Sequence, residues 1–530
     1  YPQEQKVFLG EHREVISEIR QLVDAPIVAG GVGFSSMPFA AVDYLGVDYG
    51  VKGPGEVIIC RLADALRHGT VPNVPGLLVN MGSGQVERIP VEPIKPVTGE
   101  LANGSANGNG TASGKSNGHA HTGNLLHLAG HGESRAWQVN RDTPYTRRSA
   151  DPLKVDNFQY YQRGGLGNIL TKNGCPFACA HCVEPDAKGN RFALRSLTSV
   201  VDEMELLTDQ GVYDLHTTDS EFNLAIANSK AVLREIIRRK DRDPSSSLHK
   251  LRLWIYTQPA PFDAEFAELL AQAGCGGVNV APDHVREDLL DNWKVTEKGT
   301  RYYRYSDLVN VVELTRKHGL KCMIEVLLGM PGETQETLRE CIDRTMSLDA
   351  TVVGFTLGLR IFPYSPLGMQ CAAWSDGKHA VPGVQSNTAT EPIILRTAEQ
   401  CLTPTEYERQ FMFEESGFGE PGLKEPGAFR PLYYFSPQLA EDPETIARPD
   451  GRWLNTLNFM WDYIPESDHP RVMLPTAPGL SRHDNNYADN PFLTNLALLG
   501  YKGAFWSRWR DRDAILREAE AKGFTVPAGA

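Results

Sequence analysis

Three cysteines stand close together in the segment Cys175-Pro-Phe-Ala-Cys179-Ala-His-Cys182. Their thiolates can bind three irons of a [4Fe–4S] cubane and leave the fourth iron open, which a cluster held by four cysteines does not offer. An open iron can chelate the amino and carboxylate groups of S-adenosylmethionine (SAM). One electron passed into the sulfonium then breaks a C–S bond and gives methionine and a 5′-deoxyadenosyl radical. The spacing therefore predicts a cluster with one open iron, which could bind and cleave SAM.

These cysteines have two other interpretations. A structural zinc site would need a fourth ligand, for which His181 is adjacent, but zinc knuckles usually come in pairs and no second one exists. Incidental burial does not explain the tight spacing. The other cysteines stand singly and are expected to behave as small buried apolar residues; they are Cys60, Cys275, Cys322, Cys341, Cys371 and Cys401.

Alternating strand and helix patterns extend from about residue 165 to residue 360. The strand candidates are 167–172, 212–218, 252–256, 277–281, 322–328 and 352–358. A helical pattern lies between the first two, with Leu197, Val200, Val201, Met204 and Leu207 on one face. Six βα units in a row predict a parallel sheet, either an open barrel or a doubly wound sheet. In both, chemistry lies at the carboxyl ends of the strands, and the cysteines follow the first strand.

This arrangement, Cys-x3-Cys-x2-Cys on the first loop of a βα series, resembles the radical SAM superfamily. The resemblance implies a partial (β/α)6 barrel and a SAM site completed by residues of the cysteine loop and the strand ends. The residues that it implies for SAM binding are Phe177, His181, Asp219, Ser220, Glu221, Asn279, Gly329 and Arg360. The position of His181 is usually aromatic in that family, and an imidazole can also stack on adenine.

Two of these residues have simpler interpretations. Gly329 belongs to Gly-Met-Pro-Gly-Glu-Thr334, which also suits a strand-to-helix turn in which Thr334 caps the next helix. Both interpretations can hold together. Arg360 follows the sixth strand and could hold a carboxylate of SAM or substrate, or it could be an ordinary surface arginine.

The first 60 residues contain two glycine-rich segments. A short apolar run ends at Gly30 and Gly31, and a second ends in Gly53-Pro-Gly55-Glu56. With the helical patterns around them they predict the β-α-β order of a doubly wound sheet. The segments are similar to the second half of a cobalamin-binding domain, as found in cobalamin-dependent radical SAM enzymes; a plain Gly-Gly turn is the alternative. The resemblance implies that all five residues border cobalamin.

The Asp-x-His-x-x-Gly motif that supplies an axial histidine to cobalt in many cobalamin proteins is absent. It would belong before Tyr1, so either an upstream segment is missing or cobalamin is bound without that histidine. The expected domain limits are 1–92 for the C-terminal half of a Rossmann-like cobalamin domain and 93–150 for a linker. The linker contains the low-complexity insertion 98–124. The radical SAM domain is expected at 151–375, and an irregular substrate cap at 376–530, with one clear helix near 510–522.

Composition limits the partners and the location. Hydrophobic residues make up 41% of the chain and charged residues 22%, and no apolar run reaches the about 18 residues of a membrane span. The net charge of −13 disfavours nucleic acid as a partner. Nine cysteines without a disulfide pattern or signal segment favour a reducing cytoplasm.

The resemblance implies a cobalamin-dependent methyltransferase, in which a cobalt-bound methyl group passes to a carbon of a small-molecule or peptide substrate in natural-product biosynthesis. An electron donor such as flavodoxin or ferredoxin is implied as well. The second hypothesis is a non-methylating relative that performs cyclisation, ring contraction or oxidation. The third is a non-catalytic iron–sulfur or cobalamin binding protein. Product mass and SAM cleavage separate the three.

Overall fold

The computed structural model describes residues 8–88, 156–386, 392–412, 429, 431–439, 451–474 and 491–524. Within these ranges residues 54, 71, 75, 83–84, 297–298 and 300 are excluded. The predicted low-complexity insertion at 98–124 lies outside the described residues. In the described part of the chain, no helix is long and apolar enough to cross a membrane.

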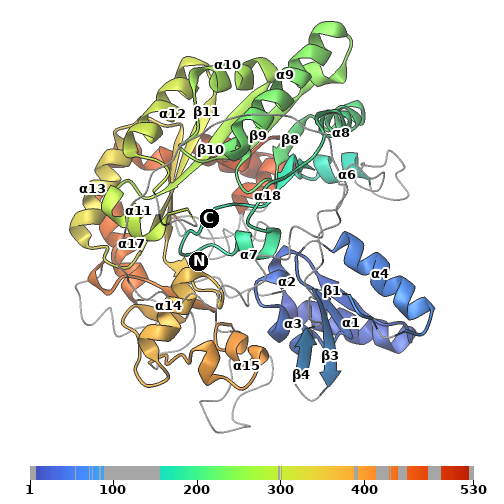
Figure 1. Cartoon of the computed structure of the whole chain (residues 1–530). Coiled ribbons are helices and arrows are strands. Elements are labelled where there is room, and N and C mark those ends of the chain that lie inside the picture. Colours follow the sequence, from blue (N-terminus) through green and yellow to red (C-terminus); the bar gives the residue numbers. More distant parts are fainter. Residues whose placement is uncertain are drawn as a thin grey trace, which may run out of the picture.

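The central element is a parallel sheet with the order β16-β12-β11-β10-β9-β8-β5 (Figure 1). All six predicted strands are present, as β5 (Gly167–Ile169), β8 (Asp214–Thr217), β9 (Arg252–Thr257), β10 (Cys275–Asp283), β11 (Lys321–Leu328) and β12 (Val352–Leu357). The seventh, β16 (Val472–Met473), pairs with β12 and comes from the region that the sequence assigns to the cap. The predicted α/β class with a partial barrel is confirmed.

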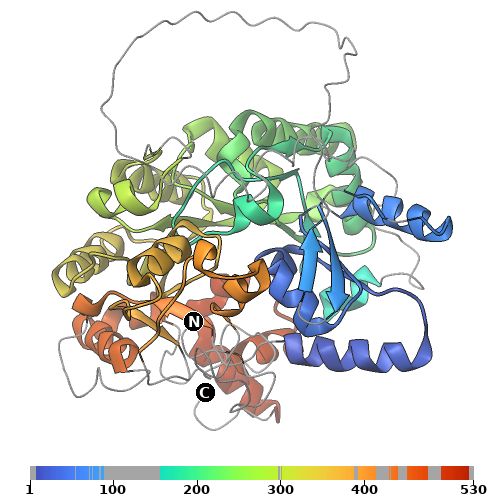
Figure 2. The same ribbon diagram turned by 60° about the horizontal axis from the view of Figure 1, so that its bottom comes forward.

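Helices between the strands cover the outer face of this sheet (Figures 1 and 2). They are α8 (Leu197–Asp209), α9 (Ile226–Arg242), α10 (Ala264–Ala273), α12 (Tyr305–Lys317) and α13 (Gln335–Met346). The short α11 (Glu287–Trp293) follows β10 and ends beside the cysteine loop. Three begin at a polar cap, because the side chains of Ser196, Asp263 and Thr334 accept hydrogen bonds from backbone N–H groups of the first turn. The predicted capping role of Thr334 is therefore confirmed.

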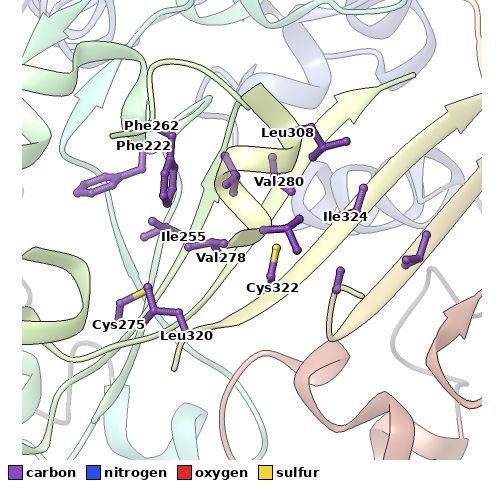
Figure 3. Close-up of a cluster of buried hydrophobic side chains, with 14 of the residues drawn as sticks. Phe222, Ile255, Phe262, Cys275, Val278, Val280, Leu308, Leu320, Cys322 and Ile324 are labelled. Carbon is purple, nitrogen blue, oxygen red and sulfur yellow. The ribbon is translucent and has the colours of Figure 1, made fainter. Parts of the chain in front are cut away.

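Apolar side chains from strands and helices form one core between these layers (Figure 3). Val278, Val280 and Ile324 are fully buried on β10 and β11, and Leu308 of α12 belongs to the same core. Each such side chain contributes about 1.5–3 kcal/mol relative to an exposed one. This core keeps the strands parallel and brings their carboxyl ends to one edge, where the cysteine loop lies.

The N-terminal part forms a separate sheet with the order β1-β2-β3-β4. β1 (Val28–Gly30) and β2 (Tyr49–Val51) are parallel and joined through α2 (Val32–Ser35) and α3 (Pro38–Leu45), as predicted; α1 (Leu9–Leu22) precedes them. After α4 (Glu56–Arg67), however, β3 (Leu77–Gly82) and β4 (Gln85–Arg88) form an antiparallel hairpin. The alternation that marks a hairpin covers few residues here, and the sequence analysis did not identify it.

The C-terminal region is more regular than its sequence indicates. Besides α19 (Arg512–Ala521), it contains α15 (Pro404–Arg409), α17 (Gly451–Tyr463) and α18 (Pro491–Leu498). The prediction of a single clear helix was therefore wrong, because the aromatic residues in these segments obscure the helical period. Together with α14 (Pro366–Ser375), this region carries a small antiparallel sheet of β13 (Leu359–Arg360), β15 (Leu432–Tyr434) and β14 (Val384–Ser386).

Candidate cofactor site at the carboxyl edge of the sheet

The cysteine loop follows β6 (Lys172–Asn173) and ends at α7 (Glu184–Lys188), which lies between the barrel and the N-terminal sheet (Figure 1). Gly174, with φ +88°, precedes the first cysteine; a Cβ there would lie 2.0 Å from the Arg191 carbonyl oxygen, so only glycine fits. The Cys182 N–H donates to the Cys179 carbonyl over 3.0 Å. The Glu184 N–H points at the Cys182 sulfur over 3.4 Å, a bond that would stabilise a thiolate.

A second segment, residues 293–296, lies antiparallel to the cysteine loop. Its contacts with the loop are the backbone bonds Ala178 N–H to Val295 O at 2.9 Å and Ala180 N–H to Trp293 O at 2.8 Å, and a bridge between Phe177 and Thr296. The loop is thus held on one side by β6 and on the other by the residues that follow α11. No pattern in the sequence indicates this pairing.

The three thiols lie in a sheltered position. Burial raises the pKa of Cys175 and of Cys182 to about 12, and raises the pKa of Cys179 as well. The described residues contain no group of three or more His, Cys, Asp or Glu that surrounds one metal ion. A single zinc would need the three thiols and His181 around one ion, whereas in a cubane each thiolate binds an iron of its own. Three thiols on one short, buried loop fit a cubane.

His181, which the sequence predicts as a SAM-binding residue, also lies at the cysteine site. Its Nε2 lies 3.9 Å from an Asp283 oxygen, and its buried Nδ1 has no hydrogen-bond partner among the described residues. Burial lowers the pKa of His181, so the ring is neutral at pH 7. Asp283 in turn forms an ion pair of 2.9 Å with the buried Lys294. Neither Asp283 nor Lys294 belongs to a motif that sequence reasoning could recognise.

The three predicted residues that follow β8 differ in what their side chains contact. Asp219 is buried. It accepts hydrogen bonds from the N–H and hydroxyl groups of Thr171 and forms an ion pair of 2.9 Å with Lys172, so both of its oxygens have partners within the protein. The Ser220 hydroxyl donates a hydrogen bond to the carboxylate of Glu184, which lies two residues after Cys182. Glu221 faces the loop, and burial raises its pKa to about 8.

Glu221 belongs to a polar wall that the sequence analysis identified only in part. Gln258 donates to one Glu221 oxygen over 2.7 Å, while the other oxygen is buried without a partner among the described residues. Gln258 also accepts from the Tyr302 hydroxyl at 2.5 Å. The Tyr302 ring stacks on Phe177 with centroids 3.9 Å apart. Phe177 and Glu221 are thus brought together through residues that no motif marked.

The next two strands add further polar groups. Asn279 donates to Glu325 over 2.9 Å and keeps a buried oxygen without a partner among the described residues. Gly329 has φ +105°, and its N–H donates to the buried Glu333 at 2.5 Å. A Cβ at this position would lie 3.3 Å from the backbone of Gly358, so the turn requires glycine.

Arg360 lies on β13, and its guanidinium contacts the Met412 sulfur at 3.6 Å and covers the Phe362 ring. Among the described residues no carboxylate forms an ion pair with it. Its predicted role toward a carboxylate of SAM or substrate remains a prediction.

The predicted glycines of the N-terminal part line one cleft of about 600 Å³. Its walls are Val28, Ala29, Gly30, Gly31, Val32, Val51, Gly53, Gly55 and Ile59 on one side and Leu170, Asn173, Ala187, Lys188 and Thr218 on the other. A Cβ at Gly31 would meet no protein atom within 4 Å, which means that this position faces open space. Glu56 begins α4 beside the cleft; its side chain is not among the described ones.

A chain of polar contacts joins this cleft to the cysteine loop. Lys188 lines the cleft and donates to Glu184 over 2.6 Å, and Glu184 accepts from Ser220 at the end of β8. On the other side of α7, Lys52 forms an ion pair of 2.8 Å with Asp186. The short helix therefore ties the N-terminal sheet to the site at the barrel edge.

A parallel partial barrel with three cysteines on its first loop defines a radical SAM enzyme. In agreement, residues 169–345 match the family model of the radical SAM superfamily.

Similarity to known proteins extends over the whole chain. The chain is 55% identical over 534 aligned residues to tryptophan 2-C-methyltransferase of Streptomyces laurentii, covering 100% of this chain and 86% of the relative. It also matches the radical SAM methyltransferase TsrM of Kitasatospora setae, solved with cobalamin and a [4Fe–4S] cluster bound. That match has a TM-score of 0.84 and 53% identity, over 99% of this chain and 87% of the other. The same enzyme with tryptophan and the SAM analogue aza-SAM gives a TM-score of 0.83 and 52% identity, over 98% and 86%. The chain belongs to this family of cobalamin-dependent radical SAM methyltransferases, as the sequence predicted.

Proposed function

We propose that this chain transfers a methyl group to carbon 2 of the indole ring of tryptophan, with SAM as the source of the methyl group. The observation that carries the proposal is the likeness to tryptophan 2-C-methyltransferase along the entire chain, at 55% identity. A relative with this fold has been solved with tryptophan bound. The substrate is therefore a free amino acid, and the peptide alternative is not favoured.

The site suits the cofactors of the family. When bound, the cluster offers an iron to SAM, and cobalamin offers a cobalt that can carry a methyl group. Cys175, Cys179 and Cys182 would hold the cluster. Gly30 and Gly31 would let cobalamin approach the backbone across a cleft whose opposite wall includes Lys188, beside the cysteine loop.

The polar groups around the loop have capacity for a ligand. Glu221 and Asn279 each carry a buried oxygen with no partner among the described residues. Leaving such an atom unpaired costs about 1–3 kcal/mol, which a hydrogen bond to a bound molecule would recover. We assign these two oxygens to hydrogen bonds with SAM or the substrate, and the His181 ring and the Phe177 face opposite Tyr302 to the adenine.

The proposal includes the electron donor and the location that the sequence suggested. A flavodoxin or ferredoxin would reduce the cluster, and a reducing cytoplasm would keep the thiols available for iron. An electron donor is identified by reconstituting tryptophan methylation with each purified protein in place of a chemical reductant.

For the test, the chain is first reconstituted anaerobically with iron, sulfide and cobalamin. It is then incubated with SAM and tryptophan. We expect a product heavier than tryptophan by one CH₂ unit, without the indole C2 proton in its NMR spectrum, together with S-adenosylhomocysteine. A tryptophan-containing tripeptide is the matched substrate control and should stay unmodified. Methionine and 5′-deoxyadenosine without a methylated product would favour the non-methylating alternative.

A further inference from the structure

Lys294 lies directly opposite Cys179 in the short antiparallel pair between the cysteine loop and residues 293–296. The backbone bonds on either side of the two residues, from Ala178 and from Ala180, define this register. Opposite residues in an antiparallel pair have Cβ atoms about 4.5–5.5 Å apart and side chains on the same face. The lysine is therefore a neighbour of the central cysteine of the motif.

The side chain of Lys294 is buried, with 2% of its surface exposed. Its ammonium donates to the Ala281 carbonyl at 2.5 Å and forms the ion pair of 2.9 Å with Asp283. The charge of Lys294 acts on both Cys179 and Cys182. A charge in such a sheltered position acts on its neighbours more strongly than a surface charge, because water screens it less.

We infer that Lys294 raises the reduction potential of the cluster held by Cys175, Cys179 and Cys182, and that Asp283 anchors the lysine and partly offsets its effect. This inference rests on the proposed cluster. Reduction adds one electron, and hence one negative charge, to the cluster. A fixed cation nearby stabilises the reduced form more than the oxidised form, and a fixed anion does the opposite. Net charge is among the factors that set the potential of iron–sulfur clusters.

A purely structural role is the competing explanation. Lys294 and Asp283 could only hold residues 293–296 against the cysteine loop. In that case, loss of either partner would loosen the same contact and disturb the cluster in the same way. An electrostatic role instead predicts shifts of opposite sign for the two partners.

The experiment uses the full chain, reconstituted anaerobically with iron and sulfide. The midpoint potential of the cluster is measured by a redox titration in which EPR detects the reduced cluster. We expect Lys294→Met to lower the midpoint, Asp283→Asn to raise it, and Lys294→Arg to stay near the parent. The control is Lys321→Met. Lys321 donates to the Ser507 carbonyl at 2.8 Å at the opposite end of β11, so its loss should leave the midpoint unchanged.

Iron content and the visible spectrum are measured on each protein before the titration. A parent that takes up no cluster would contradict the proposed function itself. A loaded Lys294→Met protein with the parent midpoint, or shifts of the same sign for Lys294→Met and Asp283→Asn, would overturn the inference alone. If Lys294→Met does not retain iron, the Asp283→Asn protein decides, because an unchanged or lowered midpoint there also overturns the inference.

Discussion

The carboxyl group of Glu408 accepts a hydrogen bond of 2.8 Å from the backbone N–H of Ala40, 368 positions away in the chain. Ala40 lies in the first turn of α3, where backbone N–H groups have no partner within the helix. The next residue of α15, Arg409, forms an ion pair of 2.7 Å with Asp43 of α3. The C-terminal region is thereby fastened to the N-terminal sheet beside the predicted cobalamin cleft, where α15 packs against α3 (Figure 1).

Glu408 makes this junction sensitive to pH. Burial raises its pKa to about 8 from an ordinary value of 4.5. Between these values the folded protein keeps a proton that the unfolded chain has lost, so stability falls as pH rises from about 5 to 8. Each pKa unit corresponds to about 1.4 kcal/mol. We expect Glu408→Gln to keep the bond to Ala40 and to lose this dependence.

The measurement is thermal unfolding of both proteins at steps between pH 5 and pH 8.5. The parent should lose stability relative to Glu408→Gln across this range. Parallel curves for the two proteins would show that Glu408 does not titrate in the folded state.

The cysteines should separate into two groups. Replacing Cys175, Cys179 or Cys182 by Ala should abolish SAM cleavage and remove most of the iron, because two thiolates cannot hold a cubane with one open iron. Cys275→Ala is a matched control, since Cys275 is buried in the barrel core away from the loop and should keep its iron. Iron analysis and the formation of S-adenosylhomocysteine and methylated tryptophan are the readouts. A Cys179→Ala protein with a full cluster and normal turnover would refute the assignment.

The single cysteines were predicted to be small buried residues, and most of them are. Cys275, Cys322, Cys341 and Cys371 are buried and Cys401 is half-buried. Cys60 is exposed on α4, so for this residue the prediction was wrong. Its position in a helical pattern indicated the helix correctly but not the face, because both faces of α4 carry apolar residues.

The barrel could be predicted from the sequence because its strands are short, largely buried runs of three to nine residues between helices with a clear period. β16 could not, since it pairs through only two residues that a long stretch of chain separates from β12. The position of Lys294 beside Cys179 could not be predicted for the same reason, the large separation of the two residues in the sequence. Its relation to Cys179 depends on a tertiary pairing of two loops, whereas the cysteines themselves are marked by local spacing.

For Asp219, the family resemblance and the geometry lead to different expectations of its role. The resemblance implies contact with SAM, but the carboxylate is fully buried against Lys172. Removal of one partner of a buried ion pair costs about 3–5 kcal/mol, because it leaves the other charge unpaired. We therefore expect Asp219→Ala to lower the free energy of unfolding by about this amount, measured by urea unfolding.

The double variant Lys172→Met with Asp219→Leu is the control, because it removes both charges and should recover much of the loss. If Asp219→Ala instead unfolds like the parent but no longer binds SAM, the contact that the resemblance implies would be the correct interpretation.

The last prediction separates the two metal cofactors. Gly31 faces the cleft, and a valine there would project into the space assigned to cobalamin. The cysteine loop belongs to a different sheet, so the cluster should be unaffected. We expect Gly31→Val to bind much less cobalamin and to methylate little, with iron content and the visible spectrum of the cluster near those of the parent.

Backbone strain is the competing cause of such a loss, because Gly31 has φ +105°, where a β-branched residue is disfavoured. Gly69→Val is the matched control. Gly69 also has a positive φ, of +63°, and open space around it, but it is not among the residues that line the cleft. If strain alone were responsible, both variants would lose cobalamin to a similar extent. If the cleft holds cobalamin, only Gly31→Val should lose it, and both should keep the cluster. A parent that binds no cobalamin after anaerobic loading would remove the basis for a methyl carrier in this cleft and leave only the radical SAM site.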